Sequence, residues 1–408
     1  MSLLNVVIIN DVAHITGGTA QVALSSAIAL AKKGHLVTVF SAVAPIMPEL
    51  NHPNLQVINL NQYEIVNDPI RKRAAVQGIW NLKASQQLAD LLNTLDPSTT
   101  VLHVHGWTKA LSASVIRQAI KKKFRVVLTL HDYFFACPNG GFFNYRRQQI
   151  CPLKPLSRAC VLANCDVRSY PQKLWRVARQ AVQNTFGQML RIKHFITISE
   201  LSETILRPYL PINSKIHRIS NMINIKREKF VDVSHNSQFT FVGVLSPHKG
   251  VGLFAKAACQ LGCDVTFVGD GRCRGEISSI YPRANITGWV SNSEVHKVLK
   301  SARVLVFPSL WYENQPLVVP EAAALGIPAI VADTSAAREM VRDGVTGLWF
   351  RGNDEVDLLK KMRILQDHET ARKMGHAAYQ KYWANPLTME KHLAQLESCY
   401  QDILSETG

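Results

Sequence analysis

Two glutamates separated by seven residues enclose the most informative stretch of the sequence, Glu313-Asn314-Gln315-Pro316-Leu317-Val318-Val319-Pro320-Glu321. This stretch follows an apolar run and opens a helical one, and proline suits the first helical turn, where no N–H is needed. The free amides of Leu317 and Val318 can then bind an anion, helped by the helix dipole. A carboxylate beside a phosphate is unfavourable unless it binds hydroxyl groups, so sugar rings are its natural partners. The structural alternative is that Glu313 caps the helix and Glu321 lies on the surface.

The segments that must position these residues alternate between strand-like and helical runs, in two series along the 408 residues. The first series predicts strands at 6–9, 36–40, 101–104, 126–130 and 195–198, and a helix over 20–33. The second predicts strands at 239–244, 265–268, 304–307 and 328–331, and helices over 251–261 and 317–325. The pattern indicates an α/β protein with two Rossmann-like, doubly wound domains facing a central cleft. We expect domains at 1–220 and 221–387, and a C-terminal helix, 388–408, that packs back on the first domain.

Polar residues follow several of these strands, at the carboxyl ends where parallel sheets bind their ligands. His131 follows the strand at 126–130, and Gly243 and Lys249 belong to the turn after the next domain's first strand. Gly17 and Gly18 allow a ligand to approach the backbone closely. His131 also fits a core histidine at a strand end.

Taken in order, these segments resemble glycosyltransferase family 4 (GT-4), a family of retaining enzymes with the GT-B fold. The stretch from Glu313 to Glu321 is similar to its E-x7-E signature in the ENxPL variant. The other matching segments are Gly17-Gly18, His131, Gly243 with Lys249-Gly250, Gly269-Asp270-Gly271, 286–290, Pro308-Ser309 and 339–347. The resemblance covers nearly the whole chain. It implies a hexosyltransferase-type enzyme that moves a sugar from a nucleotide diphosphate to an acceptor.

The resemblance also implies a role for each matching residue. Glu321 would accept hydrogen bonds from the ribose, and Glu313 would contact the transferred sugar. Lys249 would neutralise the leaving diphosphate without a metal ion, and His131 would face the sugar across the cleft. The remaining donor-binding residues would be Gly17, Gly18, Gly243, Asn314, Leu317, Val318 and, beside the nucleobase, Trp289. No cofactor is expected for catalysis, and the donor would be a UDP-, GDP- or ADP-sugar.

One position departs from the family pattern. Val244 stands directly after the glycine of the phosphate loop, where the family often has arginine. Either Lys249 and the helix amides suffice, or a basic residue from elsewhere compensates. A non-catalytic sugar-nucleotide-binding protein is a further alternative, and a sugar-nucleotide epimerase on the same fold is another.

The net charge of +16 is concentrated in one segment, because residues 109–193 contain sixteen Lys and Arg against only Asp132 and Asp166. Such a segment suggests an anionic partner, either an anionic membrane surface or a lipid-linked glycan acceptor in cell-surface polysaccharide biosynthesis. A solvated basic face without a partner is the alternative. No aromatic-interleaved recognition motif accompanies the charge, so nucleic acid is not expected. The stretch over 174–192 fits either a membrane surface or a packed core helix.

Neither a signal peptide nor an apolar run of about 18 residues is evident, so we expect a cytoplasmic protein that is at most peripheral on the inner face of the membrane.

Four of the eight cysteines, Cys137, Cys151, Cys160 and Cys165, lie within this basic segment. Four thiolates can form a structural zinc site, but these spacings lack the paired C-x2-C arrangement. Free thiols and a disulfide are the alternatives. The stretch over 131–138, HDYFFACP, resembles a GT-4 subgroup with an HDYxxxCP segment and a cysteine-bearing insertion, which implies that these cysteines form one local unit.

Overall fold

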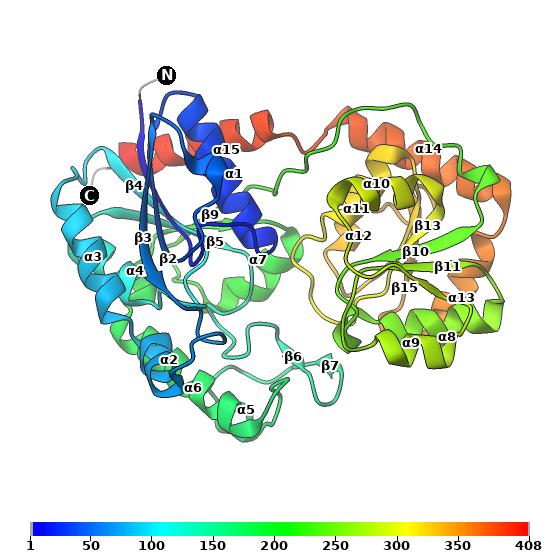
Figure 1. The fold of residues 1–408 in the computed structure, drawn as a ribbon, viewed down its shortest axis with the longest axis horizontal. Coiled ribbons are helices and arrows are strands. Elements are labelled where there is room, and N and C mark those ends of the chain that lie inside the picture. The colour runs from blue at the N-terminus through cyan, green and yellow to red at the C-terminus, as the bar shows by residue number, and fades with distance from the viewer. Residues whose placement is uncertain (1–2, 407–408) are drawn as a thin grey trace.

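Two parallel β-sheets, one in each half of the chain, form the framework of the computed structural model, which describes residues 3–406 (Figure 1). The first has seven strands in the order β3-β2-β1-β4-β5-β8-β9, and the second has six in the order β12-β11-β10-β13-β14-β15. Every pairing within these two sheets is parallel. The prediction of an α/β, GT-B-like arrangement of two Rossmann-like domains is therefore confirmed.

The elements of the first domain alternate as a doubly wound fold requires. Its strands are β1 (Asn5–Ile9), β2 (Leu36–Val43), β3 (Leu55–Gln62), β4 (Thr100–Val104), β5 (Arg125–Leu130), β8 (His194–Thr197) and β9 (Lys215–Arg218). Its helices are α1 (Gly18–Lys32), α2 (Arg71–Ile79), α3 (Leu82–Asn93), α4 (Ser114–Lys121), α5 (Arg158–Leu162), α6 (Tyr170–Phe186) and α7 (Glu200–Leu206). A small hairpin, β6 (Phe143–Asn144) and β7 (Gln149–Ile150), precedes α5.

The second domain repeats the alternation after an irregular crossing over 219–232. Its strands are β10 (Gln238–Val242), β11 (Val265–Val268), β12 (Asn285–Ile286), β13 (Ala302–Phe307), β14 (Ala329–Ala332) and β15 (Gly347–Phe350). Its helices are α8 (Val251–Leu261), α9 (Arg274–Ile280), α10 (Asn292–Ser301), α11 (Val318–Leu325), α12 (Ala337–Met340), α13 (Glu355–Ile364) and α14 (His368–Ala384). The predicted division at residue 220 falls within the crossing.

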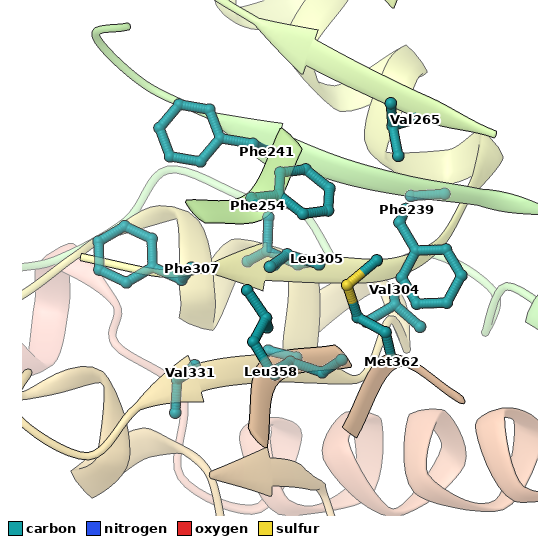
Figure 2. Packing of buried hydrophobic residues seen from close by; sticks show 14 of the residues in the cluster. Phe239, Phe241, Phe254, Val265, Val304, Leu305, Phe307, Val331, Leu358 and Met362 are labelled. Atoms are coloured by element: carbon teal, nitrogen blue, oxygen red, sulfur yellow. The ribbon is translucent and has the colours of Figure 1, made fainter. Parts of the chain in front are cut away.

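The core of the second domain explains why its strands read as nearly continuous apolar runs. Helices cover both faces of the sheet, so adjacent strand residues are buried on opposite sides. Phe239, Phe241 and Phe254 are buried together with Met362 from α13 (Figure 2). This packing fixes the carboxyl ends of β10 and β13, from which the turns at the cleft emerge.

The last helix, α15 (Met389–Ser405), belongs to the core of the first domain although it follows the second in sequence (Figure 1). Tyr400 and Ile403 are fully buried there, among residues of β1 and α1. The Glu397 carboxylate accepts bonds from Lys33 and His35 at 2.7 and 2.8 Å. The chain thus crosses the interface twice, which couples the two domains. Residues 407–408 of the helix predicted over 388–408 lie outside the described residues.

Helix α6 spans most of residues 174–192, the stretch that the sequence allows either to lie on a membrane surface or to pack into the core. It buries Lys173, Arg179, Gln180 and Gln183 and leaves Leu174 and Phe186 exposed. The interpretation that its apolar residues pack into the core is therefore wrong for these two side chains. The buried cations are stabilised by carbonyl groups, since Lys173 donates to Cys160 and Arg179 donates to Thr108. None of the helices between residues 3 and 406 combines the length and hydropathy that a bilayer crossing requires.

Candidate active site

A cavity of about 200 Å³ lies where the two domains meet. The first domain contributes Gly18, Thr19 and His131, from the start of α1 and the end of β5. The second contributes the segment from Trp311 to Gln315 and Leu317, between β13 and α11. Five predicted site residues therefore line one space, namely Gly18, His131, Glu313, Asn314 and Leu317. We name this space the cleft cavity.

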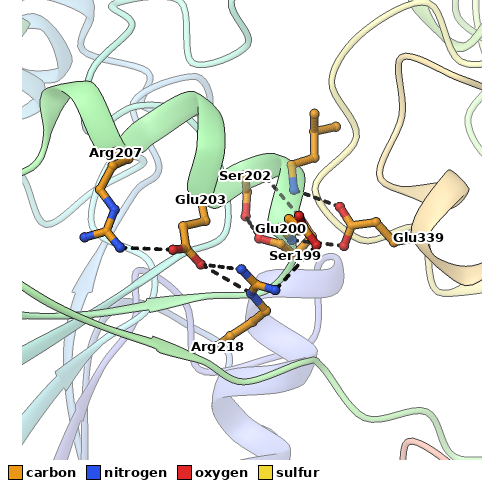
Figure 3. A network of polar contacts seen from close by, with 8 residues as sticks. Ser199, Glu200, Ser202, Glu203, Arg207, Arg218 and Glu339 are labelled. Carbon is orange, nitrogen blue, oxygen red and sulfur yellow. Dashed lines mark hydrogen bonds and ion pairs between the residues drawn. The ribbon is translucent and has the colours of Figure 1, made fainter.

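Direct bonds hold the two domains together around the cleft cavity. The Asn314 side-chain amide donates to the backbone carbonyl of His131 at 2.8 Å. The backbone amide of Asn221, in the crossing between the domains, donates to Oε1 of Gln315 at 2.7 Å and fixes the crossing to the same segment. On the same interface the Glu339 carboxylate accepts the backbone amides of Glu200 and Leu201 at 2.9 and 2.7 Å (Figure 3). Since these are the first amides of α7, the carboxylate from one domain caps a helix of the other.

Glu313 is the most strongly held group of the second domain's wall. Its Oε1 accepts bonds from Lys249 at 2.5 Å, from the Ser309 hydroxyl at 2.8 Å and from the Trp311 indole at 2.5 Å. Burial acts to raise the pKa of Glu313, but the charge of Lys249 and these three bonds together outweigh it. The pKa of Glu313 therefore lies below its ordinary value, and the carboxylate stays ionised. Sequence reasoning placed Lys249 and Glu313 in one site, and the structure joins them as an ion pair.

Close backbone packing places Lys249 against the end of β13. Gly250 has a φ of +72°, and a Cβ there would lie 1.9 Å from the Pro308 carbonyl oxygen. Glycine is therefore required at this position. Lys249 lies beside it in the turn after β10, so the turn brings the ammonium to the segment that contains Glu313.

The start of α11 presents the anion site expected from the sequence. The amides of Leu317 and Val318 donate to no acceptor within residues 3–406, as is usual for the first turn of a helix. Glu321 lies one turn further along, and burial raises its pKa to about 7. Neither Val318 nor Glu321 lines the cleft cavity.

The remaining predicted donor residues lie apart from the cleft cavity. Gly17 precedes α1 and is exposed, and a Cβ there would meet no atom within 4 Å. Gly243 lies at the end of β10, packed against Gly269. Trp289 is 71% exposed on the turn after β12. The donor-binding roles of these residues stay predictions.

A second cavity of about 210 Å³ adjoins the first and belongs to the first domain alone, so we name it the first-domain cavity. It is lined by Asp11, His105, Lys109, His131 and Asp132, among others. The amides of residues 109, 110 and 111 donate to the Asp11 carboxylate at 2.8–2.9 Å. Burial raises the pKa of Asp11, and that of Asp132 to about 6. Sequence reasoning included neither Asp11 nor His105 among the site residues, although His105 directly follows β4 and Asp11 lies two residues after the end of β1.

The four clustered cysteines lie in the segment that carries the hairpin and α5. All eight cysteines of the chain are free, and burial raises the pKa of Cys165 to about 11. Between residues 3 and 406 no three His, Cys, Asp or Glu side chains are arranged to hold a metal ion. The zinc site therefore stays a prediction.

Comparison with known families decides the class of the protein. Residues 16–227 match the model of Glycosyltransferase Family 4, which is more than half of the chain, and residues 236–368 match that of Glycosyl transferases group 1. The chain belongs to glycosyltransferase family 4. This family 4 glycosyltransferase is a transferase, as the resemblance implied. The ENxPL signature and the cysteine segment are not tested by these matches.

Among curated relatives, the glycosyltransferase is 27% identical over 213 residues to an Escherichia coli UDP-Gal:alpha-D-GlcNAc-diphosphoundecaprenol alpha-1,3-galactosyltransferase, a match that spans 52% of that relative. It is 23% identical to the Bacillus anthracis N-acetyl-alpha-D-glucosaminyl L-malate synthase over 96% of this chain and 95% of the relative.

Solved structures agree on the fold of the glycosyltransferase. Sucrose-phosphate synthase from Thermosynechococcus elongatus superposes with a TM-score of 0.71 at 20% identity, covering 99% of this chain and 100% of that one. Anabaena HepE in complex with UDP and glucose gives a TM-score of 0.65 at 14% identity, with coverage of 98% and 100%. At these identities the likeness shows the fold alone.

Proposed function

We propose that this glycosyltransferase moves a sugar, with retention of configuration, from a nucleotide diphosphate to a hydroxyl of a glycan or lipid-linked acceptor in cell-surface polysaccharide biosynthesis. The observation that carries the proposal is the cleft cavity, where Glu313 of one domain faces His131 and the start of α1 of the other. Groups that must contact donor and acceptor simultaneously belong at such an interface.

The donor would lie on the second domain. Breaking the bond between sugar and phosphate places negative charge on the diphosphate, and Lys249 with the first amides of α11 would stabilise that charge. A bound diphosphate would draw Lys249 from Glu313 and free the carboxylate for sugar hydroxyls. Glu321 would accept the ribose hydroxyls, and Trp289 would cover the nucleobase. Solved complexes of HepE contain UDP and UDP-glucose, so UDP-sugars are the first donors to test.

The acceptor would enter the first-domain cavity. Asp11 and Asp132 suit the hydroxyl groups of a sugar rather than a phosphate, because carboxylates repel a second anion. The name of the E. coli relative includes a diphosphoundecaprenol acceptor, which supports a lipid-linked glycan. The diphosphate of such an acceptor would then lie outside this cavity, toward the basic surface.

Arg272 is our candidate for the cation missing at Val244. Val244 is 44% exposed at the phosphate loop, so space for a second cation exists there. Arg272 follows β11 and is exposed, and it lies close enough to His248 for its charge to add to burial and Lys249 in lowering the pKa of that ring. Since His248 precedes Lys249, both cations would reach the same diphosphate.

A peripheral membrane contact would use the edge of the first domain formed by α2, α5 and α6 (Figure 1). Each of these helices exposes an apolar side chain, since Val76 is 67%, Leu162 74% and Phe186 59% exposed. Basic residues lie in the same segments, among them Arg71 and Arg158. Exposed apolar groups beside cations are typical of proteins that lie on anionic bilayers.

The transfer is tested in two steps on the purified protein. UDP-, GDP- and ADP-sugars are first screened for thermal stabilisation, because a bound donor stabilises the fold by mass action. Turnover of the stabilising donor is then compared between wild type and Glu313→Ala. Stabilisation without turnover above background in either protein would indicate a non-catalytic binder, and a product that is an isomeric nucleotide-sugar would indicate an epimerase.

Two further measurements test the membrane contact and the metal. Binding to vesicles that contain anionic lipid should weaken steeply with salt, and absence of binding at low salt would remove the contact. Metal analysis before and after replacement of Cys160 and Cys165 by serine tests the zinc site. Less than one zinc per chain in the wild type would exclude it.

A further inference from the structure

A groove outside the cleft lies between the hairpin β6–β7 and helix α5, in the cysteine-bearing segment of the first domain. Its volume is about 760 Å³, and its walls include Arg146 and Arg147 in the turn of the hairpin, Ile150 on β7, Leu153, and Leu162 on α5. We name it the insertion groove. Ligand-binding pockets typically have volumes of about 300–1,000 Å³, so the groove is large enough for a ligand molecule.

The positive charge around the insertion groove is not neutralised by the segment that forms it. Residues 138–168 contain five Lys and Arg and a single acidic residue, Asp166. Asp166 is fully buried and pairs with Arg176 of α6 at 2.9 Å, so it does not face the groove. Within residues 3–406 neither Arg146 nor Arg147 forms an ion pair. The rim of the groove can therefore bind an anion.

Local hydrogen bonds hold the two arginines at this rim. Oδ1 of Asn144 accepts the backbone amides of Arg146 and Arg147, each at 3.1 Å, which sets the turn of the hairpin. The Arg146 guanidinium donates to the backbone carbonyl of Arg168 at 2.6 Å. A guanidinium has five N–H donors, so most of those of Arg146 remain available. Such donors bind the oxygens of a phosphate in pairs.

Apolar side chains form the other wall of the insertion groove. Ile150 pairs with Phe143 in the hairpin and is half-buried, as is Leu153. Leu162, the last residue of α5, is 74% exposed. Burial of this surface against a hydrocarbon chain is favourable. Cations at the rim and an apolar wall together fit an amphipathic anion better than a free phosphate or a sugar.

The insertion groove and the cleft are neighbouring sites. Tyr145, which precedes Arg146, packs its ring edge-on against His248 of the second domain, with ring centroids 5.4 Å apart. His248 precedes Lys249 of the proposed diphosphate site. Gly140 lines the cleft cavity, and the hairpin begins three residues later. Figure 1 shows this hairpin between α5 and the second domain. One ligand can therefore occupy the groove and extend toward the cleft.

We propose that the insertion groove binds the lipid diphosphate of the acceptor, with Arg146 and Arg147 on the phosphates and the apolar wall along the first units of the hydrocarbon chain. The role in sugar transfer rests on the proposed function, whereas the binding of a lipid diphosphate does not. A groove encloses one chain, whereas a bilayer surface would contact the exposed side chains of α2 and α6 equally. The groove thus holds the lipid while the sugar of the acceptor enters the cleft.

The test uses farnesyl diphosphate, a short lipid diphosphate, below its micelle concentration and with the purified full chain. Isothermal titration calorimetry without donor should show saturable binding of one molecule per chain. Inorganic diphosphate has no hydrocarbon chain and should bind at least about tenfold more weakly. Absence of saturable binding of farnesyl diphosphate, or an equal affinity for inorganic diphosphate, would overturn the proposal.

Two variants, each with a matched control, locate the ligand. Arg147→Glu replaces an attraction by a repulsion and should weaken binding by about tenfold, whereas Lys121→Glu makes the same charge change at the exposed end of α4 and should not. Leu162→Ser removes part of the apolar wall and should weaken binding by about fivefold. Val76→Ser removes a side chain of α2 that is 67% exposed and lies outside the groove, and it should have no effect. Since all four side chains are exposed, the fold should remain intact, which a thermal melt checks. Equal losses in variants and controls would indicate a diffuse surface and overturn the proposal.

Lys249→Ala separates the insertion groove from the diphosphate site of the donor. The affinity for farnesyl diphosphate should be unchanged in this variant, and a loss would place the ligand in the cleft instead. Binding at the groove without sugar transfer to any lipid-linked acceptor would contradict only the proposed function. Transfer to a lipid-linked acceptor with an unchanged KM in Arg147→Glu would contradict only this inference.

Discussion

The wall of the cleft built by the second domain presents a fixed ion pair, whereas the wall built by the first domain presents neutral rings and carboxyl groups whose pKa is raised by burial. Lys249 and Glu313 are held at 2.5 Å, with the pKa of Glu313 lowered. Across the cleft, burial lowers the pKa of His131 to about 3 and raises that of Asp132 to about 6. The second domain's wall thus offers permanent charge, and we call it the charged wall. The first domain's wall offers neutral hydrogen-bonding groups, and we call it the neutral wall.

This difference corresponds to the two substrates of a glycosyl transfer. A nucleotide diphosphate is charged at every working pH, so its wall needs a permanent cation and oriented amides. An acceptor hydroxyl is neutral, and neutral acceptors of hydrogen bonds orient it without attracting a competing anion. The contrast predicts that charge-removing changes are severe on the second domain's wall and that pH acts through the buried carboxyl groups.

The largest effect is expected for Lys249→Ala. Loss of the cation removes stabilisation of the diphosphate in the transition state, and kcat/KM should fall by about 10²–10³-fold. The measurement is transfer from the donor identified by thermal stabilisation, with a thermal melt to confirm folding. Lys256→Ala removes an exposed lysine from the neighbouring helix α8 and should leave kcat/KM unchanged. A loss below tenfold for Lys249→Ala would mean that the charged wall is not the diphosphate site.

The sequence predicted the charged wall far better than the neutral one. The two glutamates, the lysine and the helix start lie in two short segments whose residue types indicate phosphate chemistry. Behind the neutral wall, Nδ1 of His103 lies 2.6 Å from the Tyr400 hydroxyl, 297 positions away in the sequence, so only the folded chain brings these two groups together. His103 also alternates with apolar residues inside a buried strand, where it resembles any core residue.

The same distinction holds for the fold. The buried central strands were predicted because their apolar runs are nearly continuous. The edge strands β3 and β9 were missed, since polar residues alternate with apolar ones along them, as in LQVINLNQ. The burial of Lys173 and Arg179 in α6 was not predicted, because the backbone carbonyls to which they donate leave no trace in residue types.

The second prediction concerns pH and Glu321. Burial raises its pKa to about 7, and ribose hydroxyls bind the ionised carboxylate, so affinity for a nucleotide-sugar should be about tenfold weaker at pH 6 than at pH 8. Nucleotide-sugars suit this titration because their diphosphate, unlike that of UDP, has no group that ionises near pH 7. Glu321→Gln has no ionisable carboxyl group at this position, so its affinity should not show this tenfold difference between pH 6 and pH 8. Isothermal titration calorimetry at the two pH values measures both affinities.

The raised pKa of Glu321 also affects the free energy of unfolding. Because the folded pKa of Glu321 exceeds its ordinary value of 4.5, its contribution to the free energy of unfolding is present below that value and is lost as the pH rises through about 7. Without donor, Glu321→Gln should therefore gain stability over wild type at pH 8 and not at pH 4. Equal differences at both pH values would contradict the raised pKa.

A smaller effect is expected for Arg272→Ala. If Arg272 supplies the cation missing at Val244, its removal should weaken donor binding by about fivefold, since the side chain is exposed and solvent screens its charge. Arg283→Ala removes an exposed arginine that pairs with Asp264 and serves as the matched control. Equal affinities of both variants and wild type would leave Lys249 as the cation of the charged wall.

The smallest effect is expected for Glu339→Gln, which tests how the two walls are held opposite each other. The Glu339 carboxylate caps α7 across the interface, so loss of its charge should lower the free energy of unfolding by about 0.3–1 kcal/mol (Figure 3). Glu203→Gln is the control, because Glu203 pairs with Arg207 and Arg218 within the first domain. Small-angle X-ray scattering should show a larger radius of gyration for Glu339→Gln alone. The same increase in both variants would mean that the contact does not set the separation of the charged and neutral walls.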